Sequence, residues 1–330
     1  MRKFLSYLLV IILVSVAALI PACSQTSPTV QPKPLRVGWF LWPGWYPIVI
    51  AKEKGFFDKH GVQVDPVLYT SYTDIFSDFA AAKLDAAHGG LYELLKSDVP
   101  NMKVVLATDN SDGAEGVVVT PDIKTPADLA GKRIGIQGAL SGSEFIITTL
   151  LRRHGLSRND LTLVDVGPEI VLETMPEQIQ GGYTWEPFLS KAIDNGYKVL
   201  FTTADTPGMV PDVIAFQNSV VKERRADVQA FVDAWFEAQE YWLAHRQEGD
   251  AIIARATGQR PEDISLEGCR IFSRQDNQKA FTKEAAFSSL FETGAKQIAF
   301  FISIGDATTA PDLDAVLDPS FVQGTGDTGK

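Results

Sequence analysis

The chain has 330 residues, a formal net charge of −11 and 45% hydrophobic residues, including 19 Phe. This length and apolar content favour a globular protein of two domains. The acidic charge argues against nucleic acid as a partner and against charge-driven binding to lipid, because both need clustered Lys and Arg. With only Cys23 and Cys269 present, a zinc cluster is excluded, and we expect Cys269 to be a small buried residue.

The first 22 residues indicate export. A basic start, Met1–Lys3, precedes an almost unbroken apolar run, Leu8–Ile20, which Pro21 ends. A run this short is typical of a secretory signal rather than a membrane span. A cysteine directly after the cleavage point resembles a bacterial lipoprotein signal, in which the thiol is acylated, for example with palmitate. We expect residues 1–22 to be removed and Cys23 to anchor the protein outside the cytoplasm; ordinary secretion and a retained anchor are the alternatives.

The next part of the chain alternates strands with helices. Residues 23–34 are rich in Pro, Ser and Thr and are expected to form a flexible tether. Beyond the tether, the alternation predicts a mainly parallel sheet with helices on its faces. The predicted strands are 35–40, 62–68, 84–87 and 102–108, and the predicted helices are 47–54 and 71–83.

Residues 121–211 are predicted to form an inserted domain. Two similar short strands, 116–120 and 212–217, bracket this block and would act as a hinge of two crossing strands. The first domain is then discontinuous, with residues 35–120 and 212–320, and the polar residues 321–330 are expected to be disordered. Within the block we predict a capped helix after Thr125, strands 132–137 and 161–166, and a helix over 143–154. Beyond residue 220 we predict long helices with apolar stripes, at 226–245 and around 287–302.

Catalytic signatures are absent from the sequence. It contains no G-x-S-x-G elbow, no Walker loop and no G-x-G-x-x-G fingerprint. The four histidines, of which His88 is the best candidate for a cleft, are scattered and do not have the spacing of metal ligands. The sequence therefore predicts a binding protein that is not an enzyme and needs no cofactor and no metal.

Five segments are candidates for a binding cleft, because ligands of open α/β sheets lie beyond the carboxyl ends of the strands. They are the aromatic segment 39–46, the glycines 89–90, the polar segment 109–113, the turn 138–143 and the segment 183–187. Ordinary core packing, a surface turn or a helix cap is the alternative for each. The predicted ligand-binding residues are Trp39, Trp42, Trp45, Tyr46, His88, Gly89, Asp109, Asp112, Ser141, Ser143, Trp185, Glu186 and Asp212.

Several motifs resemble one protein family. They are Trp42-Pro43-Gly44, 51–57 (Ala-Lys-Glu-Lys-Gly-Phe-Phe), 84–87 (Leu-Asp-Ala-Ala), 129–135 (Leu-Ala-Gly-Lys-Arg-Ile-Gly), 184–187 (Thr-Trp-Glu-Pro) and Leu317-Asp318-Pro319. Together they are similar to the extracytoplasmic solute-binding proteins of ABC importers of the nitrate, sulfonate and taurine type. Pyrimidine-precursor-binding proteins and a related pyrimidine synthase share that fold. In many relatives the stretch before Trp-Glu-Pro is a strand carrying Asp-Ala, whereas here it is 178–183 (Gln-Ile-Gln-Gly-Gly-Tyr), so the pocket floor differs.

The resemblance implies a type II periplasmic-binding-protein-like fold, with two α/β lobes that close over a small solute. It also implies a monomer that delivers this solute to an ABC permease and its ATPase, with the membrane reached through the lipid on Cys23. A periplasmic sensor that hands its ligand to a signalling receptor, and an enzyme like the pyrimidine synthase, are the alternatives. A gene neighbourhood with an ATPase and a permease would indicate the importer, and one with a kinase would indicate the sensor.

The charge of the candidate residues biases the choice of solute. The predicted ligand-binding residues include Asp109, Asp112, Glu186 and Asp212 but no Arg or Lys. Helix N-termini alone could hold a sulfonate or nitrate, but four nearby carboxylates would repel it. Indole and phenol rings beside carboxylates better fit a flat or amine-bearing solute, through stacking and cation–π contact. We expect Trp185 and Glu186 to face the segment 39–45 across the cleft.

Overall fold

A computed structural model describes residues 33–96, 102–138, 142–284, 289–305 and 310–323. The predicted signal, Cys23 and Ser141 lie outside the described residues. Within the described part of the chain, no helix combines the length and the apolar character that crossing a membrane requires.

The six-stranded sheet has the order β11-β4-β10-β3-β1-β2. Strands β1 and β3 run parallel, as do β1 and β2, whereas β10 is antiparallel to both β3 and β4, and β11 is antiparallel to β4. The strands are β1 (Leu35–Trp39), β2 (Val64–Leu68), β3 (Ala86–Gly90), β4 (Met102–Ser111), β10 (Pro211–Gln217) and β11 (Cys269–Ile271).

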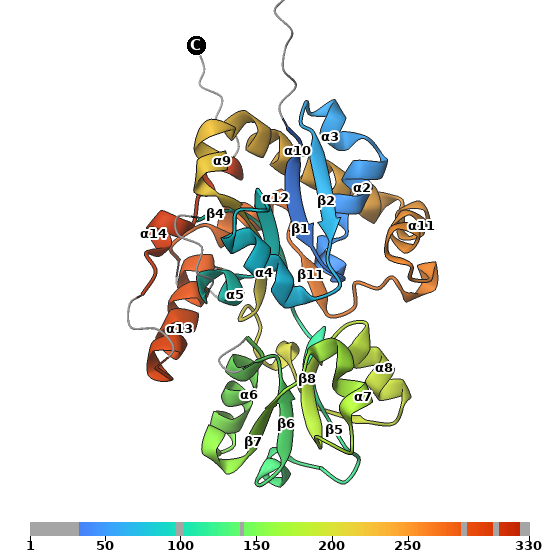
Figure 1. Ribbon diagram of the computed structural model, residues 1–330, viewed down its shortest axis with the longest axis vertical. Helices are drawn as coiled ribbons and strands as arrows, with labels where there is room; N and C mark the ends of the chain where they lie inside the picture. Colours follow the sequence, from blue (N-terminus) through green and yellow to red (C-terminus); the bar gives the residue numbers. More distant parts are fainter. Residues whose placement is uncertain (1–32, 97–101, 139–141, 285–288, 306–309, 324–330) are drawn as a thin grey trace, which may run out of the picture. The chain divides into compact units, whose positions relative to one another are not determined.

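The five-stranded sheet has the order β7-β6-β8-β5-β9. Here β6 is parallel to β7 and β8, and β5 is antiparallel to β8 and β9. The strands are β5 (Glu115–Val119), β6 (Arg133–Ile136), β7 (Thr162–Asp165), β8 (Gly181–Trp185) and β9 (Lys198–Thr202). Figure 1 shows α6 (Gly142–Arg153) beside one face of this sheet and α7 (Val171–Thr174) and α8 (Phe188–Asp194) beside the other.

Both sheets are mixed: in each, four strands run in the same direction, as the predicted mainly parallel sheets require, while β5 in one sheet and β10 and β11 in the other run against them. The reason is the connection between the sheets: β5 and β10 enter their sheets from the other sheet, without the crossover helix that keeps neighbouring strands parallel. The predicted boundary after residue 120 also needs correction. Because β5 pairs with β8 and β9, residues 115–119 belong to the five-stranded sheet, and the chain leaves the six-stranded sheet after Ser111.

Two long helices follow residue 220, as the apolar stripes predict, and α10 (Arg225–Ala244) lies against the six-stranded sheet, with Phe231 on Phe216 of β10 and Trp235 on His88 of β3. Helix α10 packs against α2 (Pro47–Glu53), α3 (Phe56–Lys59) and α11 (Arg246–Thr257). Trp235 and Trp242 are fully buried, so they belong to the core. The other helices of this part are α4 (Tyr72–Ala80), α5 (Leu91–Lys96), α9 (Asn218–Glu223), α12 (Arg274–Ala280), α13 (Leu290–Ser303) and α14 (Leu313–Val316).

Two local predictions have clear outcomes. The capping pair Thr125 and Asp128 is present, with the Thr125 N–H donating to Asp128 Oδ2 at 2.8 Å, but it caps a short 3₁₀ turn (Pro126–Leu129) rather than an α-helix. The disordered tail was predicted to begin too early. Phe321 and Val322 are buried, and the Arg225 guanidinium lies 4.2 Å from the centre of the Phe321 ring.

Candidate functional site

A cavity is lined by residues from both sheets and from the segments that follow their strands. It encloses about 50 Å³ that the centre of a water molecule can occupy. Phe40, Trp42, Trp45 and Tyr72 come from the six-stranded side, and Tyr183 and Trp185 come from β8 of the five-stranded sheet. The other lining residues are Leu41, Gly90, Leu91, Tyr92, Glu93, Glu115, Gly142, Phe145, Ile146, Met209, Val210, Pro211, Asp212 and Gln297.

One side of the cavity is an aromatic wall, made of Phe40, Trp42, Trp45, Tyr72 and Trp185. The ring of Trp185 packs edge-to-face with the rings of Tyr72 and Phe40, with centroid distances of 5.4 Å and 6.4 Å. The ring centroids of Trp45 and Tyr72 are 5.9 Å apart. These centroid distances are those of favourable ring pairs. The indole N–H groups of Trp45 and Trp185 are buried and have no hydrogen-bond partner among the described residues. The wall therefore offers flat apolar area.

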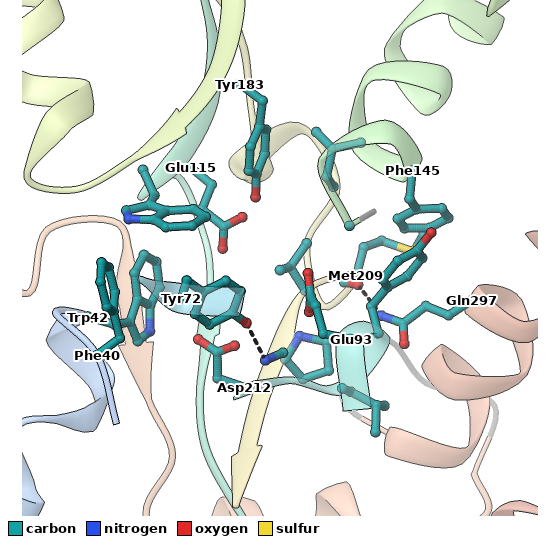
Figure 2. Close-up of a pocket in the computed structure, with 18 of the residues that line it drawn as sticks. Phe40, Trp42, Tyr72, Glu93, Glu115, Phe145, Tyr183, Met209, Asp212 and Gln297 are labelled. Carbon is teal, nitrogen blue, oxygen red and sulfur yellow. Dashed lines mark hydrogen bonds between the residues drawn. The ribbon is translucent and has the colours of Figure 1, made fainter. Parts of the chain in front are cut away.

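The ionisable side chains that line this cavity are acidic. Three carboxyls, those of Glu93, Glu115 and Asp212, line it and form the acidic group, whereas no Lys, Arg or His occurs among its described lining residues. Figure 2 shows the three side chains around one central space, with the Tyr183 hydroxyl pointing toward it. They come from α5, β5 and β10, which are far apart in the sequence.

Burial changes the protonation of the acidic group. It raises the pKa of Glu115 to about 8, with a further contribution from the charge of Glu93, and it raises the pKa of Glu93 to about 7. Burial and the neighbouring Asp109 hold the pKa of Asp212 well above its usual range. Without a cation in the cavity, much of the acidic group is therefore neutral near pH 7.

Asp109 lies directly behind the acidic group. It is fully buried, and its carboxylate accepts hydrogen bonds from Trp42 Nε1 at 2.9 Å, from Thr108 Oγ1 at 2.7 Å and from Cys269 Sγ at 3.4 Å. A hydrogen bond also links it to Asp212. Burial raises the pKa of Asp109 to about 6, against these hydrogen bonds, which lower it. Asp109 thus supports Trp42 and Asp212 without lining the cavity itself.

Four of the predicted residues line the cavity: Trp42, Trp45, Trp185 and Asp212. Trp185 contacts Phe40 of the aromatic segment edge-to-face within the aromatic wall. Glu186 does not line the cavity, because it caps α8 instead: Ser190 donates to it through its N–H at 3.2 Å and its hydroxyl at 2.8 Å. That is the helix-cap alternative.

Other predicted residues are packed elsewhere. Trp39 is buried on β1, and Tyr46 accepts a hydrogen bond from Gln259 at 2.9 Å and packs against Trp242. His88 lies in the core between Trp45 and Trp235, and burial lowers its pKa to about 3. None of these three lines the cavity.

The last predicted residues are Gly89, Asp109 and Asp112, which lie in or after strands that are longer than predicted, and Ser143, which lies in a helix. Strand β3 continues through Gly90, so Gly89 lies inside the sheet against Phe76, and Gly90 reaches the cavity. Strand β4 continues through Ser111, so Asp109 is not in a loop and Asp112, in the turn that follows, is exposed. Ser143 is buried in α6, where its hydroxyl accepts the Gln137 N–H at 2.9 Å.

Sequence reasoning missed Glu93, Glu115 and Tyr72. Tyr72 and Glu93 sit in the first turn of helices that follow strands, which is a signal that could have found them. Glu115 gave no signal, because its place depends on the crossing from β4 to β5. Among the described residues, no cluster of three or more His, Cys, Asp or Glu could hold a metal ion.

Solved structures define the fold. The alkanesulfonate-binding protein of Xanthomonas axonopodis pv. citri, bound to MOPS, matches 87% of this chain and 99% of its own with a TM-score of 0.71 and 17% identity. The two mixed sheets and their crossings therefore form the periplasmic-binding-protein fold. The model of the NMT1-like family matches residues 29–257, and the chain belongs to this family.

Curated relatives are similar at lower coverage. A protein of Brucella abortus (strain 2308), described as a binding protein, is 24% identical over 258 residues, which is 76% of this chain and 78% of that protein. The taurine-binding periplasmic protein of Escherichia coli is 24% identical over 66% of this chain and 72% of its own. The formylaminopyrimidine-binding protein of Halalkalibacterium halodurans is 27% identical over 38% of this chain and 41% of its own.

Proposed function

We propose that this chain is the solute-binding component of an ABC importer and that its cavity holds a small amine-bearing organic solute. Family membership, the fold and the binding proteins among the relatives support the first part. The cavity itself supports the second part, because an aromatic wall and the acidic group face the same space. Rings and carboxylates attract an organic cation through cation–π contact and ion pairing.

The names of the relatives point to solutes of different kinds, and the cavity favours one of them. Alkanesulfonates carry a sulfonate, taurine carries both a sulfonate and an amine, and a formylaminopyrimidine is a flat ring with an amino group. With three carboxyls and no basic partner among its described lining residues, the cavity offers a sulfonate no positive charge, and each carboxyl that is ionised would repel it. The single observation that carries the proposal is therefore the position of Glu93, Glu115 and Asp212 beside the aromatic wall.

The proposed protein works outside the cytoplasm, tethered by a lipid on Cys23. It has two lobes, one built on each sheet, and the connections at 112–114 and 203–210 act as the hinge. The lobes close on the solute, which is released unchanged to the permease, so the protein binds and does not catalyse. Closure would be a population shift that favours the solute-bound conformation.

A ligand screen tests the proposal directly. Purified protein is mixed with organic amines, aminopyrimidines, taurine, alkanesulfonates and nitrate, and the melting temperature is measured. We expect an amine to raise it, since a solute that binds the folded state stabilises that state, and uptake of that amine by cells to need this protein. Binding of an alkanesulfonate, nitrate or taurine, with no response to any amine that lacks a sulfonate, would contradict the proposed solute.

Membrane fractionation tests the anchor. Cys23→Ser should release the protein from membranes into the soluble extracytoplasmic fraction, while the wild type stays bound. If the variant remains with the membrane, residues 8–20 hold it there and the lipid anchor is not needed.

A further inference from the structure

Asp109 and Asp212 face each other on neighbouring strands. They are register partners in the antiparallel pair of β4 and β10, so their side chains lie on the same face of the sheet. Asp109 is fully buried, only 6% of Asp212 is exposed, and a hydrogen bond joins the two carboxyls. Two carboxylates cannot hydrogen-bond to each other, because neither has a proton to donate. One of the two carboxyls must therefore carry a proton.

In the described part of the chain, the titratable side chains that act on the pair are acids. Glu115 and Glu93 place further negative charge near Asp212, and the side chains of Tyr72 and Cys269 also lie within reach of its charge. These four residues come from β5, α5, α4 and β11. Because like charges in a buried group favour protonation, these neighbours help the pair to keep its proton.

The hydrogen bonds around the pair favour a proton on Asp212. The Asp109 carboxylate accepts hydrogen bonds from Trp42, Thr108 and Cys269, which stabilise its negative charge. Burial raises the pKa of both carboxyls, but the hydrogen bond between them raises the pKa of Asp212 and lowers that of Asp109. The O–H of Asp212 would then donate to Asp109, and the negative charge of the pair would lie on Asp109.

The chain closes over Asp109 and leaves Asp212 open to the cavity. A Cβ atom on Gly44 would lie 1.8 Å from Asp109 Oδ2, so the backbone of the turn Pro43–Trp45 lies directly against this carboxyl. Asp212 lines the cavity, and Figure 2 shows its carboxyl near Tyr72 at the central space. A solute in the cavity can therefore contact Asp212, whereas Asp109 lies behind it.

We infer that Asp109 and Asp212 share one proton, carried by Asp212, and that Asp212 meets the solute as a neutral hydrogen-bond acceptor. Asp109 is then a positioning residue, which holds the Asp212 proton and turns the carbonyl oxygen toward the cavity. This inference rests on the proposed function, which it deepens: Glu93 and Glu115 supply the negative charge for an amine, and Asp212 directs one of its N–H groups. An amine does not displace this proton, because two buried charges would then lie side by side.

Infrared spectroscopy on the whole protein tests the shared proton without any solute. At pH 9 we expect the wild type to show the carbonyl band of a protonated carboxyl that Asp212→Asn lacks. Asp109→Asn should lose the same band although Asp212 is intact, because the charge that holds the proton is gone. Asp112→Asn changes an exposed carboxyl and is the control, which should keep the band.

Two outcomes of the infrared experiment overturn the inference. One is a band of equal strength in the wild type and in Asp212→Asn. The other is a band that persists in folded Asp109→Asn, because burial alone would then keep Asp212 neutral. Circular dichroism checks folding, and Asp109→Ser replaces the asparagine variant if that one does not fold.

Calorimetry tests the role of Asp212 toward the solute, with the organic amine that raises the melting temperature most in the screen. Asp212→Asn keeps an N–H toward Asp109 and an oxygen toward the cavity, as the protonated acid does, whereas Asp212→Leu keeps neither. The leucine variant should therefore bind the amine about tenfold more weakly than the asparagine variant. The number of protons released on binding should be the same in Asp212→Asn as in the wild type.

An equally large loss of affinity in both Asp212 variants, with one proton fewer released than in the wild type, would mean that Asp212 acts as a charge and would overturn its neutral role. A wild type that binds no organic amine instead contradicts the proposed function. The infrared band still decides in that case whether Asp109 and Asp212 share a proton.

Discussion

The aromatic wall and the acidic group face the same cavity but differ in how they are built. Four of the wall's rings, those of Phe40, Trp45, Tyr72 and Trp185, are joined by ring pairs with centroids 5.4–6.4 Å apart, and the wall comes mainly from segments close to β1 and β8. The acidic group comes from three distant elements, and burial raises the pKa of each of its carboxyls. The wall thus supplies contact area that does not depend on pH, while the acidic group selects charge and responds to pH.

The largest expected effect is the loss of one carboxylate. Glu115→Gln should weaken an amine solute by ~2–4 kcal/mol, roughly thirtyfold to a thousandfold in Kd, because it removes one partner of a buried charge pair. Calorimetry with the amine found in the screen measures this. Glu186→Gln is the matched control: Glu186 caps α8 outside the cavity, so its affinity should not change. Equal losses in the two variants would contradict the assignment.

Loss of a ring should cost somewhat less. Trp185→Ala should weaken binding by ~1–3 kcal/mol, roughly tenfold to a hundredfold, because Trp185 is a buried anchor that also positions Tyr72 and Phe40. The loss should be the same at pH 6 and pH 8, which distinguishes the wall from the acidic group. Unchanged affinity in a folded variant would mean that the ring is only packing.

The wall could be predicted from the sequence because its signal is local. Five rings lie within residues 39–46, at the end of a predicted strand and just after it, and Trp185 ends another strand. The sequence could not show which rings face inward. Trp42 and Trp45 line the cavity, while Trp39 and Tyr46 belong to the core, because the short turn Pro43–Trp45 and helix α2 set their directions.

The acidic group could not be predicted because its residues meet only through the topology. Glu115 follows the crossing from β4 to β5, which was predicted after residue 120 instead. Asp109 was expected in a loop, but its strand continues, since Trp42, Thr108 and Cys269 satisfy the buried carboxyl. The α/β alternation and the long helices were local patterns and were predicted well; the mixed strand directions depend on long-range pairing.

Solute affinity should also depend on pH. Because burial raises the pKa of Glu93 to about 7 and that of Glu115 to about 8, the free cavity holds protons that a cation must displace. Affinity for an amine should therefore rise from pH 6 to pH 8, by up to about tenfold per pH unit for each proton released. Calorimetry in two buffers of different ionisation enthalpy counts these protons. Affinity that falls with rising pH, while the amine stays charged, would contradict this.

The smallest expected effect comes from a ring outside the cavity. Tyr46→Phe removes the hydroxyl that accepts the Gln259 hydrogen bond at 2.9 Å but keeps the ring against Trp242. The free energy of unfolding should fall by ~0.5–1.5 kcal/mol, the usual contribution of one hydrogen bond, which denaturant melts measure. Solute affinity should stay unchanged, since Tyr46 belongs to the aromatic segment but not to the wall. A tenfold loss of affinity would mean that the boundary between wall and core lies elsewhere, and that the whole segment 39–46 acts as one binding surface.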